Sequence, residues 1–246
     1  MGYHESLTVG RNAVLEAFRS GKTVDRLFVL DGCQDGPVKT ILREAKKQDT
    51  MVQYVKKERL DQLSETKNHQ GVIAYCAACE YAEVSDILEN AKKKGEAPFI
   101  VLLDGIEDPH NLGAIIRTAN QAGAHGVIIP KRRAVGLTAT VARTSAGAVN
   151  YTPVAKVTNL VTVMEDLKKE GMWFVCADMD GEEMYSLNLK GPIGLVIGNE
   201  GEGVSRLVKE HCDMVASIPM KGDIDSLNAS VAMGVLAYEI VRQRRF

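Results

Sequence analysis

The sequence predicts an α/β protein with a smaller N-terminal unit and a larger unit built on a parallel sheet. Short apolar runs without polar alternation recur from residue 99 onward, as in strands that are covered on both faces. Amphipathic helical patterns separate these runs, and alternating strands and helices form doubly wound sheets. The chain has 246 residues, enough for two domains that each bury a core.

Residues 1–76 predict the small unit. Val14, Leu15 and Phe18 lie on one face of an expected helix over 12–18. Further helices are expected at 37–47 and 57–65, and strands at 26–30, 52–55 and 71–75. Residues 77–98 are highly charged and end in Gly95-Glu-Ala-Pro98, which indicates a linker.

Residues 99–246 predict the larger unit. Strands are expected at 99–103, 126–129, 173–177, 194–197 and 214–218. Helices are expected between them at 112–122, 160–169 and 204–210, and a long helix closes the chain over about 227–242.

Composition excludes some classes of protein. No apolar run approaches the roughly 20 residues of a membrane span, and the first residues lack a signal-peptide pattern, so a cytoplasmic location is expected. The five cysteines include one C-x-x-C, Cys76 and Cys79, without further ligands at zinc spacing, so no metal is expected. The net charge of −2 argues at first against a nucleic-acid partner.

Ligands of open α/β sheets bind at the carboxyl ends of the strands, and three loops at such positions carry unusual sequence. The first, 104–120, enters a helix near Asn111, a good N-cap residue, and places Arg117 two turns into it. Ile115, Ile116 and Ala119 can then face the core. A cap and a solvated cation would explain these two residues equally well.

The second loop, 197–204, contains Gly198, Gly201 and Gly203, which let backbone amides approach a ligand closely. Its two acidic residues favour a cationic or hydroxyl-bearing ligand over a pyrophosphate, and the chain holds no G-x-G-x-x-G fingerprint.

The third loop, 218–230, gathers Ser226, Asn228 and Ser230 at the start of the last helix. Ser226 is the expected cap, and one cap does not explain all three residues.

Together these loops resemble the SPOUT class of methyltransferases, and within it the SpoU (TrmH) family of RNA ribose 2'-O-methyltransferases. The matching stretches are Asp108-Pro-His-Asn-Leu-Gly113 with Arg117, Ile197-Gly-Asn-Glu-Gly-Glu-Gly203, and Ile218-Pro-Met220 with Ser226-Leu-Asn228. Segments 10–18 and 69–75 extend the resemblance, and are most similar to enzymes that methylate a guanosine ribose in large-subunit (23S) ribosomal RNA.

The resemblance implies a deep trefoil knot in residues 99–246, a linker over 77–98 and an L30e-like RNA-binding domain in residues 1–76. It also implies a homodimer formed through the knotted domain, ribosomal RNA as partner, and S-adenosylmethionine as cofactor. The residues implied to bind the cofactor are Gly198, Asn199, Ile218, Met220 and Leu227. Those implied to be catalytic are Arg117, Asn111, Glu200, Ser226 and Asn228.

Arg117 is the residue that the family resemblance connects with activation of the 2'-hydroxyl. A guanidinium stays protonated under physiological conditions and is a poor base, so binding of an RNA phosphate and orientation of the hydroxyl is the favoured role. His110, His69 and His125 are weaker candidates for a general base. Glu200 is expected to support the geometry of the pocket or to meet a partner subunit.

Three alternatives stay open: the same chemistry on transfer RNA, a ribosome-associated RNA-binding protein without catalysis, and a nicotinamide-dependent enzyme. The near-neutral charge does not exclude RNA, because a few well-placed cations suffice. Residues 1–76 carry a net charge of +2, and local basic clusters occur at 131–133 with Arg143 and at 242–245.

Overall fold

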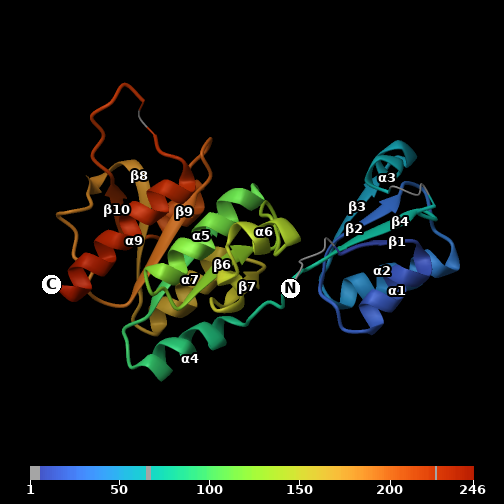
Figure 1. The fold of residues 1–246 in the computed structure, drawn as a ribbon, viewed down its shortest axis with the longest axis horizontal. Coiled ribbons are helices and arrows are strands. Elements are labelled where there is room, and N and C mark those ends of the chain that lie inside the picture. Colours follow the sequence, from blue (N-terminus) through green and yellow to red (C-terminus); the bar gives the residue numbers. More distant parts are fainter. Residues whose placement is uncertain (1–5, 65–67, 225) are drawn as a thin grey trace. The chain divides into compact units, whose positions relative to one another are not determined.

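Figure 1 shows the fold as a computed structural model, which describes residues 6–64, 68–224 and 226–246. The chain divides into two compact units. The first contains Met1–Glu80 and Gly136–Thr140, and the second contains Tyr81–Val135 and Val141–Phe246. No helix in the described ranges is long and apolar enough to cross a membrane.

The first unit is a four-stranded sheet of order β1-β4-β2-β3, in which only β2 and β3 are parallel. Leu27 and Val29 of β2 pack against helices α1 and α2, whereas Phe28 points to the other face and packs with Leu60 of α3. Its elements are β1 (Ser6–Val9), α1 (Arg11–Arg19), β2 (Val24–Leu30), α2 (Gly36–Lys47), β3 (Met51–Val55), α3 (Lys57–Leu63) and β4 (Val72–Cys76). The expected helices and strands are present; β1 was not predicted, and Glu65, the expected end of α3, lies outside the described residues.

The second unit contains a six-stranded sheet of order β10-β8-β9-β5-β6-β7, and all of its neighbouring strands are parallel. The predicted α/β class with a parallel sheet is therefore confirmed. The strands are β5 (Phe99–Asp104), β6 (Gly126–Pro130), β7 (Val154–Val157), β8 (Trp173–Glu183), β9 (Ile193–Gly198) and β10 (Met214–Ser217). The helices are α4 (Val84–Lys94), α5 (Pro109–Gln121), α6 (Ala139–Thr144), η1 (Ala148–Asn150), α7 (Leu160–Lys169), α8 (Arg206–Glu210) and α9 (Ala229–Arg245).

Helices cover both faces of this sheet. Ile100 and Leu102 of β5 belong to one buried cluster with residues of α4, α7 and α8. Val101 and Leu103 alternate with them and are equally buried, so they face the opposite side, where α5 and α9 pack against each other and against the sheet (Figure 1). Burial on both faces explains why the strands read as continuous apolar runs.

The segment expected to be a linker, 77–98, is largely part of the second unit. It contains α4, whose Ile87 and Ala91 are buried. A Cβ added to Gly126 of β6 would lie 2.5 Å from Cγ1 of Ile87, so the helix sits directly on the sheet. The division between the units falls after Glu80. The abundant charges are the exposed face of an amphipathic helix rather than a sign of a linker.

Strand β8 is longer than the sequence pattern suggests. It continues past Ala177 to Glu183, because β10 pairs with its distal half through Ala216 with Glu182 and Ser217 with Glu183. This extension carries polar residues to the carboxyl edge of the sheet.

Candidate functional site

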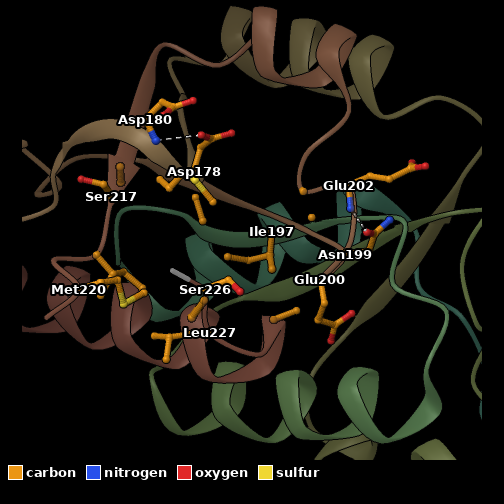
Figure 2. Close-up of a pocket in the computed structure, with 18 of the residues that line it drawn as sticks. Asp178, Asp180, Ile197, Asn199, Glu200, Glu202, Ser217, Met220, Ser226 and Leu227 are labelled. Carbon is orange, nitrogen blue, oxygen red and sulfur yellow. Dashed lines mark hydrogen bonds between the residues drawn. The ribbon is translucent and has the colours of Figure 1, made fainter. Parts of the chain in front are cut away.

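A pocket of about 680 Å³ opens at the carboxyl ends of β8, β9 and β10. Four segments line it: residues 177–183 of β8, the loop 197–203, the loop 216–220, and residues 226–232 at the start of α9. Figure 2 shows Asp178 and Asp180 on one side of this pocket and Met220, Ser226 and Leu227 on another, with Ile197 between them. Its size suits a small organic ligand.

The structure gathers the residues that the family resemblance implies for cofactor binding. Gly198, Asn199, Ile218, Met220 and Leu227 all line the pocket. Glu200 and Ser226, expected to be catalytic, line it as well.

The loop 198–205 folds back on itself at the mouth of the pocket. A Cβ on Gly198 would lie 2.0 Å from the carbonyl carbon of Gly203, so only glycine fits there. The Asn199 side chain accepts hydrogen bonds from the amides of Gly201 and Glu202, at 2.9 and 2.7 Å. This Asx turn holds the loop in one tight conformation.

Three side chains that are distant in sequence meet beside the pocket. Asn111 donates from Nδ2 to Oε1 of Glu200. Asn228 donates from Nδ2 to the same Oε1 at 3.1 Å, and to Oδ1 of Asn111 at 3.0 Å. Figure 2 shows Glu200 turned away from the loop toward α5. The carboxylate and the two amides form one connected group, called the Asn–Glu–Asn cluster below.

Helices α5 and α9, which flank the Asn–Glu–Asn cluster, are capped by other residues than expected. Asp108 is the N-cap of α5, where its side chain accepts from the amide of His110 at 2.9 Å. Asn228 is the N-cap of α9 and accepts from the amide of Ser230 at 3.0 Å. The expectations of caps at Asn111 and Ser226 were therefore wrong. Because Asp108 takes the capping role, the Asn111 side chain is available for the Asn–Glu–Asn cluster.

Arg117 lies on the exposed face of α5, while Ile115, Ile116 and Ala119 are buried, as the helical spacing predicted. It does not line the pocket. Within the described ranges its guanidinium makes no hydrogen bond or ion pair, so its five donors remain available to a ligand.

Sequence reasoning missed an acidic wall of the pocket formed by Asp178, Asp180 and Glu183. Burial acts to raise the pKa of Asp178, but hydrogen bonds from Lys209, at 2.7 Å, and from the amide of Asp180 outweigh it and lower the pKa below its ordinary value. The signal was present: these carboxylates follow the predicted strand 173–177, at the edge where ligands bind.

The histidines considered as bases lie elsewhere. His125 is fully buried, accepts from the Phe99 amide through Nδ1 at 3.0 Å, and contacts Glu96 through Nε2 at 3.1 Å. His69 is also buried and contacts Asp61 of the first unit. His110 is exposed in the first turn of α5. None of the three lines the pocket.

The two basic clusters have different surroundings. Arg132 and Arg133 are exposed in the loop after β6. This loop lies next to the one after β5, because the amide of Val135 donates to the carbonyl of Ile106 at 3.0 Å. In the C-terminal cluster, Arg242 pairs with Glu239 at 2.7 Å and Arg244 donates to three backbone carbonyls. That second cluster therefore stabilises the fold.

Family comparisons match both units. Residues 98–238 match the SpoU rRNA Methylase family, and residues 7–82 match the family described as RNA 2'-O ribose methyltransferase substrate binding. The protein YacO of Bacillus subtilis (strain 168), assigned to the TrmH family of tRNA/rRNA methyltransferases, is 48% identical over 246 residues, which cover 99% of this chain and 98% of YacO.

Solved structures show the same fold. The SpoU methyltransferase AviRb from Streptomyces viridochromogenes, in complex with AdoMet, has a TM-score of 0.62 and 27% identity, over 98% of this chain and 91% of its own. An AdoMet-bound rRNA methyltransferase from Sinorhizobium meliloti gives 0.60 and 25%, over 96% and 86%. The TrmH/SpoU tRNA modifying enzyme of A. aeolicus gives 0.56 and 28%, but covers only 65% of this chain and 84% of its own.

The three loops that suggested the family in the sequence thus meet in the structure through Asn111, Glu200 and Asn228, and all three lie within residues 98–238, which match the family. The chain belongs to the SpoU (TrmH) family of RNA 2'-O-ribose methyltransferases.

Proposed function

We propose that this protein transfers a methyl group from S-adenosylmethionine to the ribose 2'-hydroxyl of a guanosine in large-subunit (23S) ribosomal RNA, and that it acts as a homodimer. The main support for methyl transfer at this site is the position of the Asn–Glu–Asn cluster, which joins the glycine loop of the pocket to the starts of α5 and α9. A methyl donor bound in the pocket and an RNA bound at α5 would meet at this cluster.

The lining of the pocket fits S-adenosylmethionine. Ile197, Leu227 and Met220 offer apolar surface for an adenine ring, and the close turn at Gly198 presents backbone groups for hydrogen bonds. Asp178 and Asp180 place carboxylates where a cationic ligand is favoured over a phosphate. When bound, the cofactor supplies a methyl group activated on a sulfonium. Gly198, Asn199, Ile218, Met220 and Leu227 are the residues proposed to hold it, and the surrounding chain is proposed to form the family's trefoil knot.

The remaining residues are proposed to hold the RNA. Arg117 binds a backbone phosphate and orients the 2'-hydroxyl for in-line attack, with that phosphate or a nearby group accepting the proton. Asn111 and Asn228 bind ribose or phosphate oxygens, and Ser226 donates to the same region. Glu200 accepts both amides on one oxygen, so its proposed role is to orient Asn111 and Asn228 rather than to act as a base.

The preference for ribosomal over transfer RNA rests on the first unit, proposed to be an L30e-like RNA-binding domain. The rRNA methyltransferase of S. meliloti aligns with 96% of this chain, whereas the A. aeolicus tRNA enzyme aligns with 65%. Exposed Arg132 and Arg133 near the α5 loop would add phosphate contacts.

Incubation with methyl-labelled S-adenosylmethionine and a mixture of unmodified ribosomal and transfer RNA tests this assignment. We expect label in one guanosine of the large-subunit RNA. Label in transfer RNA alone would replace the substrate with tRNA. An absence of label in every RNA, with a folded protein, would favour an RNA-binding protein that has lost catalysis.

A further inference from the structure

A buried carboxylate lies under the exit of the glycine loop. Asp104, the last residue of β5, is 7% exposed, and its Cα pairs in register with that of Gly198 in the adjacent β9. Its Oδ2 accepts a hydrogen bond at 2.8 Å from the amide of Ser205. In the described parts of the chain this is the one hydrogen bond of the Asp104 side chain.

The loop ends and α8 begins at Ser205, whose amide makes this hydrogen bond. Ser205 is the N-cap of α8, and its side chain makes no capping hydrogen bond. The carboxylate of Asp104 therefore reaches the loop from a different strand, 101 residues earlier in the chain. Burial of a carboxylate is costly without a partner, so this bond ties the position of Ser205 to the sheet.

The start of the loop is fixed from the same strand. A Cβ on Gly105, whose φ is +82°, would lie 2.8 Å from Nδ2 of Asn199. Asn199 thus packs on the backbone that follows Asp104, while its Oδ1 closes the turn on Gly201 and Glu202. The loop between these two points contributes five consecutive residues to the pocket wall, from Asn199 to Gly203.

We infer that Asp104 is a positioning residue for the donor pocket: its hydrogen bond to Ser205 holds the loop 198–205 in the conformation that binds S-adenosylmethionine. Asp104 does not line the pocket itself. Its effect on the ligand acts entirely through the loop. The inference rests on the proposed function for the identity of the ligand, but not for the anchoring of the loop.

Four variants of the full chain test the inference. Asp104→Ala removes the acceptor. Ser205→Pro removes the donor without altering the buried carboxylate, and the φ of −59° at Ser205 is one that proline adopts. Asp104→Asn keeps an oxygen that can accept the bond. Asn159→Ala is the matched control, because Asn159 also accepts from backbone amides at a helix start in this unit, at 2.9 and 3.3 Å, but lies outside the pocket.

Two readouts are needed: the Kd for S-adenosylmethionine by titration calorimetry, and amide hydrogen exchange over residues 198–205 without ligand. Loss of a buried hydrogen bond should weaken binding about tenfold in Asp104→Ala and Ser205→Pro and accelerate exchange of the loop. Asp104→Asn should restore both, and Asn159→Ala should leave both as in the parent.

Unchanged loop exchange and Kd in Asp104→Ala would overturn the inference, as would an equal loss of binding in Asn159→Ala. Failure of Asp104→Asn to rescue would exclude the hydrogen bond as the basis of the effect. If the parent protein does not bind S-adenosylmethionine, the proposed function fails, and the exchange measurement still decides whether Asp104 anchors the loop.

Discussion

Asn228 donates a hydrogen bond of 3.0 Å to Asn111, a residue that lies 117 positions earlier in the chain. The same Asn228 caps α9 through its Oδ1. One side chain thus fixes the start of α9 and connects it to α5, with Glu200 of the glycine loop as the third member.

Asn228→Ser should separate these two roles. Serine is also a good N-cap, so we expect a melting temperature close to that of the parent. It has no side-chain amide, so it cannot donate to both Asn111 and Glu200. Because the cluster positions groups in the site, turnover should fall about 10- to 100-fold. Asn228→Ala removes the cap as well and should lower stability by about 1 kcal/mol. Parental kcat in Asn228→Ser would show that the cluster does not position the reacting groups.

Arg117→Lys tests how the exposed arginine of α5 acts. Lysine keeps the positive charge but loses the planar, bidentate donor geometry. If Arg117 orients RNA through a phosphate, kcat should fall about tenfold or more while the affinity for S-adenosylmethionine stays constant. Steady-state kinetics with RNA and calorimetry with the cofactor separate the two. Nearly full turnover would exclude bidentate orientation.

His125 should make the stability of the second unit depend on pH. Burial lowers its pKa and outweighs the hydrogen bond with Glu96, which raises it. Below the unfolded value of about 6.5, the unfolded chain binds a proton that the folded chain does not, so stability is lost as the pH falls toward the folded pKa.

An NMR titration of the His125 ring should give a pKa below 6.5, the ordinary value. In His125→Asn, whose amide oxygen can still accept from Phe99, the loss of stability with falling pH should be smaller. A folded pKa at or above the ordinary value would contradict this explanation.

The proposed homodimer has a suitable surface on α9. Val231 and Tyr238 are 49% and 51% exposed, and their spacing of seven residues places them on one face of the helix. The double variant Val231→Lys with Tyr238→Lys should change the mass measured by light scattering from that of two chains to that of one. Tyr151→Lys is the control, because Tyr151 is also an exposed aromatic residue, at 80%. A monomeric parent, or a dimeric double variant, would exclude this interface.

The elements of the fold followed from local patterns, because buried parallel strands and amphipathic helices leave signals within a few residues. The edge strands β1 and β7 were not predicted, because a polar residue, Thr8 or Lys156, interrupts each four-residue run. The apolar residues of β10, which is equally short, are consecutive. Helix α4 was read as part of a linker because its exposed face dominates its composition.

Individual site residues were predicted only where they belong to a sequence motif of the family. Both Asp108 and Asn111 are cap-forming types, and Pro109 at the first helical position was the local cue that selects Asp108. The contact of Asn111 with Glu200 spans 89 positions, and that of Asp104 with Ser205 spans 101. Such contacts depend on strand order, which no local pattern contains.

A 2'-O-methyltransferase places the methyl group on a ribose 2'-oxygen of the RNA. Alkaline hydrolysis of RNA labelled from methyl-labelled S-adenosylmethionine reports this position, because the 2'-hydroxyl is the nucleophile of that cleavage and its methylation protects the adjacent bond. We predict that the label is recovered in an alkali-stable dinucleotide, and that Arg117→Ala abolishes it. Label recovered in mononucleotides would place the methyl group on a base and exclude a ribose 2'-O-methyltransferase.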